Sequence, residues 1–460
     1  MRSKMTGWFG LAAVMLSISS ALAQDLPDTM IQLKGAVTLA SQRYHLLQAR
    51  KYESAAAAAN VDVVKYSRLP TIDATYQAGI ATANNLTGMF YPNGILPISG
   101  PPSATNKYDP ATGSAAGLLL NWQALTFGER NARIGSAVAE ANARRSVYQN
   151  DLFGHTVNVI SNYLDVLLAY DQVNIQQRNI ERVTANLQQS RTLTRTGIKA
   201  GVDTALFLSE LSKAKVELFN AQKQLETKQW LLANLVVLDA LPIPTDTAFL
   251  NELPPITENN DTSFSAHPLI QYAQSQFSLS QSKEKALKRS FFPKLTIWGT
   301  GFARGSGFEA DGSVKTWDGL GLSRYNYGAG LQLAFPIMKY GEVKRQVHQQ
   351  NLLSKAAQEN LEESRSALST RQRIANTTLR HSLLIAAETK EQLRSGEKAF
   401  YAMQIRYSTG LVNFSDLIQT QYNLLRAELD VKQAYWEAWK ALLLEAAVKG
   451  DVNVFLNEIK

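Results

Sequence analysis

The segment Arg68-Leu69-Pro70-Thr71-Ile72 has a counterpart 223 residues later, Phe291-Phe292-Pro293-Lys294-Leu295. In both places a proline follows a helical pattern and opens an extended run. Two further pairs recur in the same order, at offsets of 213 and 209: Phe127-Gly128-Glu129-Arg130 with Tyr340-Gly341-Glu342-Val343, and Lys199-Ala200-Gly201-Val202 with Ser408-Thr409-Gly410-Leu411. This internal similarity predicts a duplicated unit that reads helix, strand, loop, strand, very long helix, tight turn and helix.

The two long helices are expected over 128–196 and 341–409, because neither range contains proline and apolar residues recur at three- and four-residue spacing. Each would be about 100 Å long at 1.5 Å per residue. The shorter helices over 34–67 and 203–238 would together equal that length, and those over 267–290 and 412–449 nearly do. This arithmetic favours a tall helical barrel over a globule.

These patterns divide the chain into four parts. Residues 1–23 are expected to be a signal peptide, and a proline-rich linker over 242–265 is expected to join the repeats. The first repeat, 24–241, would hold strands 71–81 and 115–125, long helix 128–196 and helix 203–238. The second repeat, 266–460, would hold strands 294–303 and 326–336, long helix 341–409 and helix 412–449.

The N-terminus predicts export from the cytoplasm. Arg2 and Lys4 precede an apolar run that ends in Ala21-Leu22-Ala23, a small-x-small cleavage pattern. The chain has no cysteine, which excludes disulfides, thiolate metal sites and a lipidated cysteine. Its net charge of +8 is spread along the chain, so it predicts no nucleic-acid partner. After the signal, no apolar stretch is long enough for a membrane helix, so any membrane contact would be made by strands.

The four predicted strands have the length and alternation of tilted membrane strands. The residues expected to face lipid are Ile72, Tyr76, Leu118, Leu120, Trp122, Leu331 and Leu333. The strand over 294–303 alternates less clearly, since Leu295 and Ile297 oppose Trp298 and Phe302. Aromatic girdle candidates are Trp122, Trp298, Tyr325 and Tyr327. A half-buried soluble sheet is the alternative for any single strand.

Four strands cannot close a barrel, and open sheet edges are not tolerated in lipid. Three copies would supply twelve strands, a number compatible with an open lumen. The loops over 81–114 and 304–324 are rich in Gly, Pro, Asn and Ser and suit the longer extracellular loops. The fold class expected is therefore a mostly α, mixed α/β membrane protein.

Over nearly all of its mature length the sequence resembles the TolC-like outer-membrane efflux family. The motifs that carry this resemblance are Leu69-Pro70, Phe292-Pro293, Leu125-Thr126-Phe127-Gly128, Phe335-Pro336-Ile337-Met338-Lys339-Tyr340-Gly341, His267-Pro268-Leu269 and the turn from Tyr407 to Leu417. His267-Pro268-Leu269 is similar to the family's helix start, with His267 where the family usually has Asn. The resemblance implies a homotrimer with a β-barrel in the outer membrane and a periplasmic α-helical barrel. It also implies a periplasmic adaptor and an inner-membrane transporter as partners.

The resemblance also implies roles for residues near the predicted helical turns. Gly201-Val202 and Gly410-Leu411 match the family's tip element, where adaptors dock, although C-cap glycines would look the same. Asp416 matches an aspartate that narrows the closed periplasmic aperture, and a helix N-terminal aspartate is the equal alternative. Gln419 stands where many members have a second aspartate, and Val412 stands where some have a basic residue.

Motifs of enzymes and metal sites are absent from the sequence: none of the five histidines has metal-ligand spacing, and no P-loop or nucleophile elbow occurs. We therefore expect no enzyme, no cofactor and no metal. The leading hypothesis is a passive trimeric export duct, and the alternative is a periplasmic coiled-coil scaffold or adaptor that never enters lipid. The exported substrate is not encoded in these patterns, since drug efflux, metal efflux and protein secretion of the type I kind would look alike.

Overall fold

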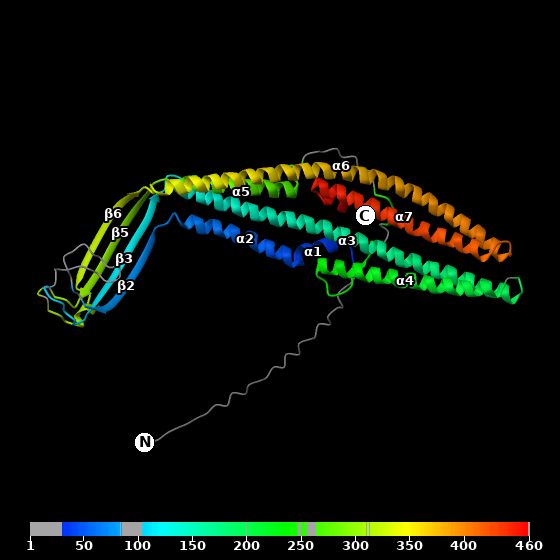
Figure 1. Ribbon diagram of the computed structural model, residues 1–460, viewed down its shortest axis with the longest axis horizontal. Coiled ribbons are helices and arrows are strands. Elements are labelled where there is room, and N and C mark those ends of the chain that lie inside the picture. The colour runs from blue at the N-terminus through cyan, green and yellow to red at the C-terminus, as the bar shows by residue number, and fades with distance from the viewer. Residues whose placement is uncertain are drawn as a thin grey trace, which may run out of the picture.

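The computed structural model describes residues 30–82, 84, 104–198, 200–246, 250–254, 264–309, 311 and 313–458. The expected signal peptide over 1–23 lies outside these residues, as does much of the expected linker. The molecule is elongated, with a β-sheet at one end and two helical turns at the other (Figure 1).

The sheet contains four antiparallel strands in the order β2-β3-β5-β6. Their bounds are Thr71–Ala81 for β2, Ala111–Leu125 for β3, Lys294–Ser306 for β5 and Arg324–Ala334 for β6. β3 begins before the expected 115 because Ala111 pairs with Ala81 at the end of β2. A short 3₁₀ helix, η2 (Asp318–Leu320), lies between β5 and β6 in the chain and packs against β3 and β5.

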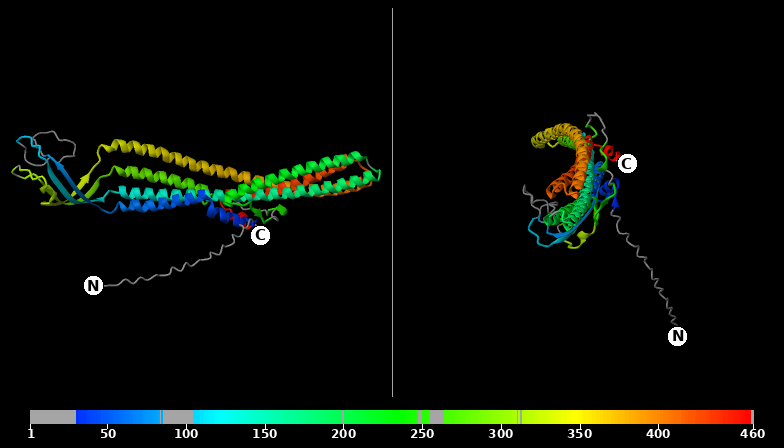
Figure 2. Two further views of the ribbon diagram at one scale, coloured as in Figure 1. Left: turned by 90° about the horizontal axis from the view of Figure 1, so that it is seen from below. Right: turned by 90° about the vertical axis from the view of Figure 1, so that its right-hand side faces the viewer.

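Two very long helices, α3 (Glu129–Arg195) and α6 (Lys339–Ser408), run from the sheet to the far end of the molecule (Figure 1). α3 packs against α2 (His45–Tyr66) and α4 (Gly201–Val236), while α6 packs against α5 (Pro268–Ser290) and α7 (Phe414–Lys449). α5 and α7 also contact α3, so they join the two long helices. Seen along the long axis, the helices lie on an arc and do not form a closed bundle (Figure 2).

Among the described residues, no helix combines the length and the apolar character that a membrane crossing requires.

The single helix expected over 34–67 is two helices, α1 (Leu33–Arg43) and α2 (His45–Tyr66). They separate at Tyr44, whose backbone is extended with φ −63° and ψ 119°. Its ring stacks on His155 of α3 at 3.9 Å between centroids. No proline or glycine lies at this break, so no helix-breaking residue in the sequence predicts it. The break coincides instead with a tertiary contact, the stacking of Tyr44 on His155.

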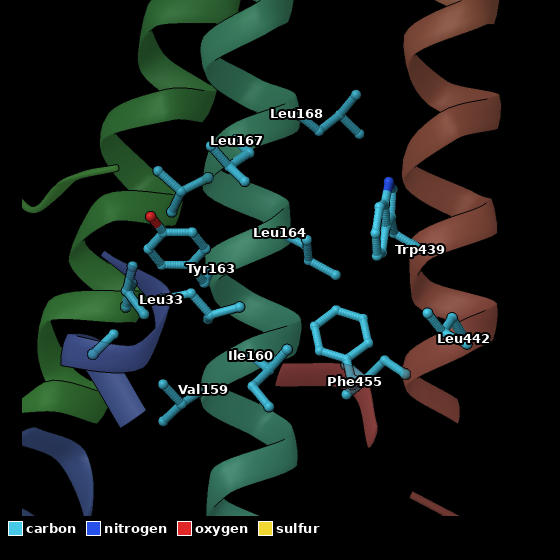
Figure 3. Packing of buried hydrophobic residues seen from close by; sticks show 14 of the residues in the cluster. Leu33, Val159, Ile160, Tyr163, Leu164, Leu167, Leu168, Trp439, Leu442 and Phe455 are labelled. Atoms are coloured by element: carbon cyan, nitrogen blue, oxygen red, sulfur yellow. The ribbon is translucent and has the colours of Figure 1, made fainter. Parts of the chain in front are cut away.

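The main hydrophobic core lies halfway along the molecule and is centred on one stretch of α3, from Val159 to Leu168 (Figure 3). Trp439 and Leu442 of α7 and Phe455 of α8 (Asn453–Asn457) pack against it. Each fully buried side chain of this size contributes about 1.5–3 kcal/mol relative to exposure. Because the cluster includes residues of α1, α3, α4 and α7, this core ties the first and last thirds of the chain together.

A small parallel pair, β1 (Met30–Ile31) with β4 (Ile243–Pro244), lies beside this core. Tyr163 of α3 is fully buried, and its hydroxyl lies 2.9 Å from the carbonyl oxygen of Ile31 and 3.0 Å from Oδ2 of Asp246. The same carboxylate oxygen accepts the backbone N–H of Leu33 at 2.9 Å. Hydrogen bonding to Asp246 therefore holds the start of the described chain against the segment that joins the two halves.

Candidate functional site

The strand register gives the sheet one apolar and one polar face. Ile72 is opposite Leu120, Trp122 is opposite Ile297, and Ile297 is opposite Leu331. Because side chains alternate along each strand, the register places all the residues expected to face lipid on one face: Ile72, Tyr76, Leu118, Leu120, Trp122, Leu331 and Leu333. Most are exposed, with Leu331 at 70%, so none of the described residues forms a layer that covers this face.

The opposite face carries most of the polar side chains of the sheet, together with Leu119, Trp298 and Phe302. It carries Thr71, Asp73, Gln77, Asn121, Thr296, Arg304, Arg324, Asn326 and Gln332. Trp298 also belongs to it, because Trp298 pairs with Asn121 on one side and Gly330 on the other. The girdle candidates therefore separate: Trp122, Tyr325 and Tyr327 share the apolar face, and Trp298 does not. The pattern of β5 alone was ambiguous, and its pairing partners decide the assignment.

The two outer strands, β2 and β6, each have one neighbouring strand in the described sheet. Their outer edges therefore present unpaired backbone N–H and C=O groups. An exposed edge beside an exposed apolar face is a site for association with another strand.

The helical turns at the other end have matching backbone geometry. Gly197 ends α3 with φ +76°, and Gly410 ends α6 with φ +79°. The next residue in each turn donates its N–H five residues back, Ile198 to Leu193 and Leu411 to Arg406, both at 2.9 Å. These are Schellman-type ends, in which a positive φ favours glycine.

This geometry corrects the interpretation of Gly201 as a C-cap glycine. Gly201 is the first residue of α4, and the left-handed glycine is Gly197, four residues earlier. The counterpart of Gly410 is therefore Gly197, and the offset there is 213, the same as between Phe127 and Tyr340. Val202, Ile198 and Leu411 are all exposed apolar residues at this tip, at 61%, 59% and 72%.

The corrected offset makes Asp203 the counterpart of Asp416, which the sequence reading missed. Asp203 lies in the first turn of α4, and Asp416 lies in the first turn of α7. The hydroxyl of Tyr407 donates to Oδ2 of Asp203 at 3.2 Å and so links the two helical hairpins. Burial raises the pKa of Tyr407 to about 12, and the nearby Asp203 carboxylate adds to this. The phenol thus stays protonated and able to donate.

Asp416 and Gln419 are exposed on α7. The Asp416 backbone N–H donates to Oδ1 of Asn413, the N-cap of α7, at 2.9 Å. Gln419 donates from Nε2 to Oδ1 of Asn423 at 3.2 Å. A first-turn aspartate favours the helix dipole, and the role of Asp416 at an aperture stays a prediction.

A groove of about 420 Å³ lies between α3, α4 and α7 near the tip. Val183, Ile418 and Leu425 form part of its apolar lining. On its rim, Glu210 accepts the hydroxyl of Tyr422 and forms an ion pair with Lys213 at 2.7 Å. Within the described part of the chain, no cluster of His, Cys, Asp or Glu has the geometry of a metal site.

The sequence over residues 36–236 and 263–443 matches the family model for the outer membrane efflux protein. This match covers most of the chain. The chain belongs to the outer membrane efflux protein family. Members of this family are outer-membrane channel subunits of efflux systems and not enzymes, and this chain is such a subunit with a periplasmic helical extension.

Solved structures of similar fold include outer-membrane channels from three bacteria. CmeC of Campylobacter jejuni is 16% identical, with 91% of this chain and 85% of that chain covered and a TM-score of 0.73. VceC of Vibrio cholerae is 14% identical, with 91% and 96% covered and a TM-score of 0.72. MtrE of Neisseria gonorrhoeae, solved in its open state, is 17% identical, with 91% and 89% covered and a TM-score of 0.71. No curated protein sequence matches this efflux protein.

Proposed function

We propose that three copies of this efflux protein associate edge to edge, with β6 of one copy against β2 of the next. The resulting twelve-stranded barrel would cross the outer membrane, and the curved helical layers would close into a periplasmic duct. The observation that carries this proposal is the four-stranded sheet with two unpaired edges and one bare apolar face. Lipid tolerates neither edge, so closure with sister copies satisfies both.

In this arrangement the apolar face contacts lipid through Ile72, Tyr76, Leu118, Leu120, Trp122, Leu331 and Leu333. The polar face then lines a water-filled lumen, as alternation in membrane barrels requires. The helices supply further support, because Val216, Phe219 and Trp230 of α4 and Leu384 and Tyr401 of α6 are exposed. A neighbouring copy would cover these side chains, since exposed apolar surface favours association.

We infer that the helical tip faces the inner membrane and docks on a periplasmic adaptor, which connects it to an inner-membrane transporter. The exposed Val202 and Leu411, beside Gly201 and Gly410, would offer the apolar contacts, together with the nearby groove. Asp416, with Gln419 one turn later, would ring the aperture with three carboxylates and favour cations there. The duct is passive, because transport energy comes from the transporter.

The test is to purify the full chain from outer membranes in detergent, measure its mass by light scattering, and record conductance in planar bilayers. We expect a mass of three copies and stable open-channel currents. A protein released by osmotic shock as a soluble single copy, with no conductance, would contradict the proposal and favour a periplasmic scaffold.

A further inference from the structure

Two arginines face each other on the polar face at the loop end of the sheet. Arg304 of β5 and Arg324 of β6 are direct cross-strand partners, and both are exposed. Directly opposite residues in an antiparallel pair have Cβ atoms about 5 Å apart, and like charges there are destabilising. A bound anion would remove this repulsion.

Among the described residues, no carboxylate forms an ion pair with Arg304 or Arg324. The nearby acidic loop residues Glu309 and Asp318 pair with Lys315 at 3.1 and 3.9 Å. On the polar face Asp73 lies in the row of Leu119 and Thr300, four residues from Arg304, or about 13 Å along the strand. The undescribed residues at 83, 85–103, 310 and 312 include no Asp or Glu. A counter-charge that bridges the two guanidinium groups would therefore come from outside the protomer.

Aromatic rings continue the same face toward the helices. The guanidinium carbon of Arg304 lies 5.9 Å from the centroid of the Phe302 ring, and Phe302 is opposite Asn326. Trp298 follows four residues along, opposite Gly330. A Cβ atom at Gly330 would lie 2.7 Å from the Trp298 ring, so the glycine leaves the space in which this ring lies against β6.

We propose that this arginine–aromatic patch, formed by Trp298, Phe302, Arg304, Arg324 and Asn326, binds organic anions that carry an aromatic ring as they leave the duct. The inference rests on the proposed function, because the patch meets cargo only if the polar face lines the lumen. A carboxylate or sulfonate bridges the two guanidinium groups and removes their repulsion. The attached ring lies on Phe302, about two residues or 7 Å away along the strand.

A trimer brings two such arginines per copy, or six, to the outer end of the lumen. Weak binding suits this position, because a conducted solute has to leave the site as readily as it enters. The positive outer ring and the carboxylates proposed for the periplasmic aperture would act on solutes of opposite charge at opposite ends of the duct.

The experiment measures block of single-channel current in planar bilayers by 1-naphthalenesulfonate added on the loop side. We expect wild-type currents to be blocked, and the block to need at least about 10-fold more ligand in the R304Q/R324Q double variant, since one lost charge-assisted contact is worth about that factor. Methanesulfonate, which lacks the ring, and naphthylmethylammonium, which carries the opposite charge, should block far less.

The matched control is Arg365→Gln, which removes an exposed arginine of α6 that pairs with Glu362 at 2.6 Å, far from the sheet. Its block should equal that of wild type. If the double variant conducts normally and is blocked as strongly as wild type, the proposed anion binding by the patch is overturned, while the proposed channel function is not. Loss of trimer stability in Arg324→Gln that Asp73→Asn restores would also overturn it, because Arg324 would then pair with Asp73 of a neighbouring copy. Absence of any current in wild type would instead contradict the proposed function.

Discussion

At the residue scale, His267 acts as the cap of α5 in place of the asparagine that is usual there. Its Nδ1 accepts the N–H of Leu269 at 3.1 Å, and its Nε2 lies 3.1 Å from the carbonyl oxygen of Ala447. This pattern requires a neutral ring, because a protonated Nδ1 cannot accept. Burial lowers the pKa of His267, and the charge of Arg371 lowers it further.

The first prediction is that acid weakens this cap. Because the folded-state pKa is below the usual value of about 6.5, the stabilisation is complete above that pH and is lost as pH falls through the folded-state pKa. His267→Ala should lower stability by about 1 kcal/mol. His267→Asn should keep the cap and reduce the pH dependence of stability. The pH dependence that remains should come from His155, because burial also lowers the pKa of His155. Thermal melts by circular dichroism from pH 5 to 7.5 check this; equal pH dependence in His267→Asn and wild type would refute it.

The second prediction contrasts two glycines of the tip. Gly410 has φ +79°, so Gly410→Ala should cost about 1–2 kcal/mol. Gly201 starts α4, so Gly201→Ala should be neutral or slightly stabilising. Urea unfolding of both variants measures the difference. Equal losses would contradict the prediction, because a residue that starts a helix should tolerate alanine.

Residue patterns predicted much of this tip, and the error had a specific cause. Both turns were found because glycine interrupts a long helical pattern, but the first turn contains two glycines four residues apart, Gly197 and Gly201. Sequence similarity aligned the second of them, whereas backbone dihedral angles single out the first. The pairing of Tyr407 with Asp203 depends on how the two hairpins pack, which no local pattern contains.

At the scale of elements, the third prediction concerns neighbouring residues of β6 that point to opposite faces. Leu331→Lys places a charge on the apolar face, where a membrane barrel loses about 2–4 kcal/mol for a midplane charge. Gln332→Lys places the same charge on the polar face. We expect Leu331→Lys, and likewise Leu118→Lys on β3, to block outer-membrane assembly, and Gln332→Lys to assemble normally. Membrane fractionation and the amount of heat-resistant trimer are the measurements, and normal assembly of all three variants would favour a soluble scaffold.

Period-two alternation sufficed to assign faces to β2 and β6, and to β3 apart from Leu119, which lies on the polar face with Asp73 and Thr300. It failed for β5, where Trp298 and Phe302 oppose Leu295 and Ile297, and only the register with Asn121 and Gly330 separates them. The break between α1 and α2 was equally hidden. Tyr44 is an ordinary helical residue in sequence, and its stacking on His155, 111 residues later, is a tertiary contact.

At the scale of the whole molecule, the lengths of the helices predicted an elongated shape, whereas the contacts that hold its two halves together could not be predicted. One of these contacts is a bidentate ion pair between α3 and α7: Arg182 donates to the two carboxylate oxygens of Glu428 at 3.0 and 2.6 Å. Asn186 continues this seam, because its Nδ2 donates a buried hydrogen bond to Oε1 of Gln421 at 2.9 Å. Polar residues on long helices look like solvated faces until a partner helix is placed against them.

The fourth prediction tests this seam. The side chains of Arg182 and Glu428 are only 18% and 12% exposed, so Glu428→Gln leaves a largely buried cation without its counter-charge. With a discount for the remaining exposure, the loss should be about 2 kcal/mol. The double variant R182M/E428M removes both charges and should be close to wild type, because matched apolar replacement of an ion pair is often neutral. Chemical unfolding of the single and double variants measures both values. If the double variant lost as much stability as Glu428→Gln, the pair itself, and not the avoidance of an unpaired charge, would hold α3 and α7 together.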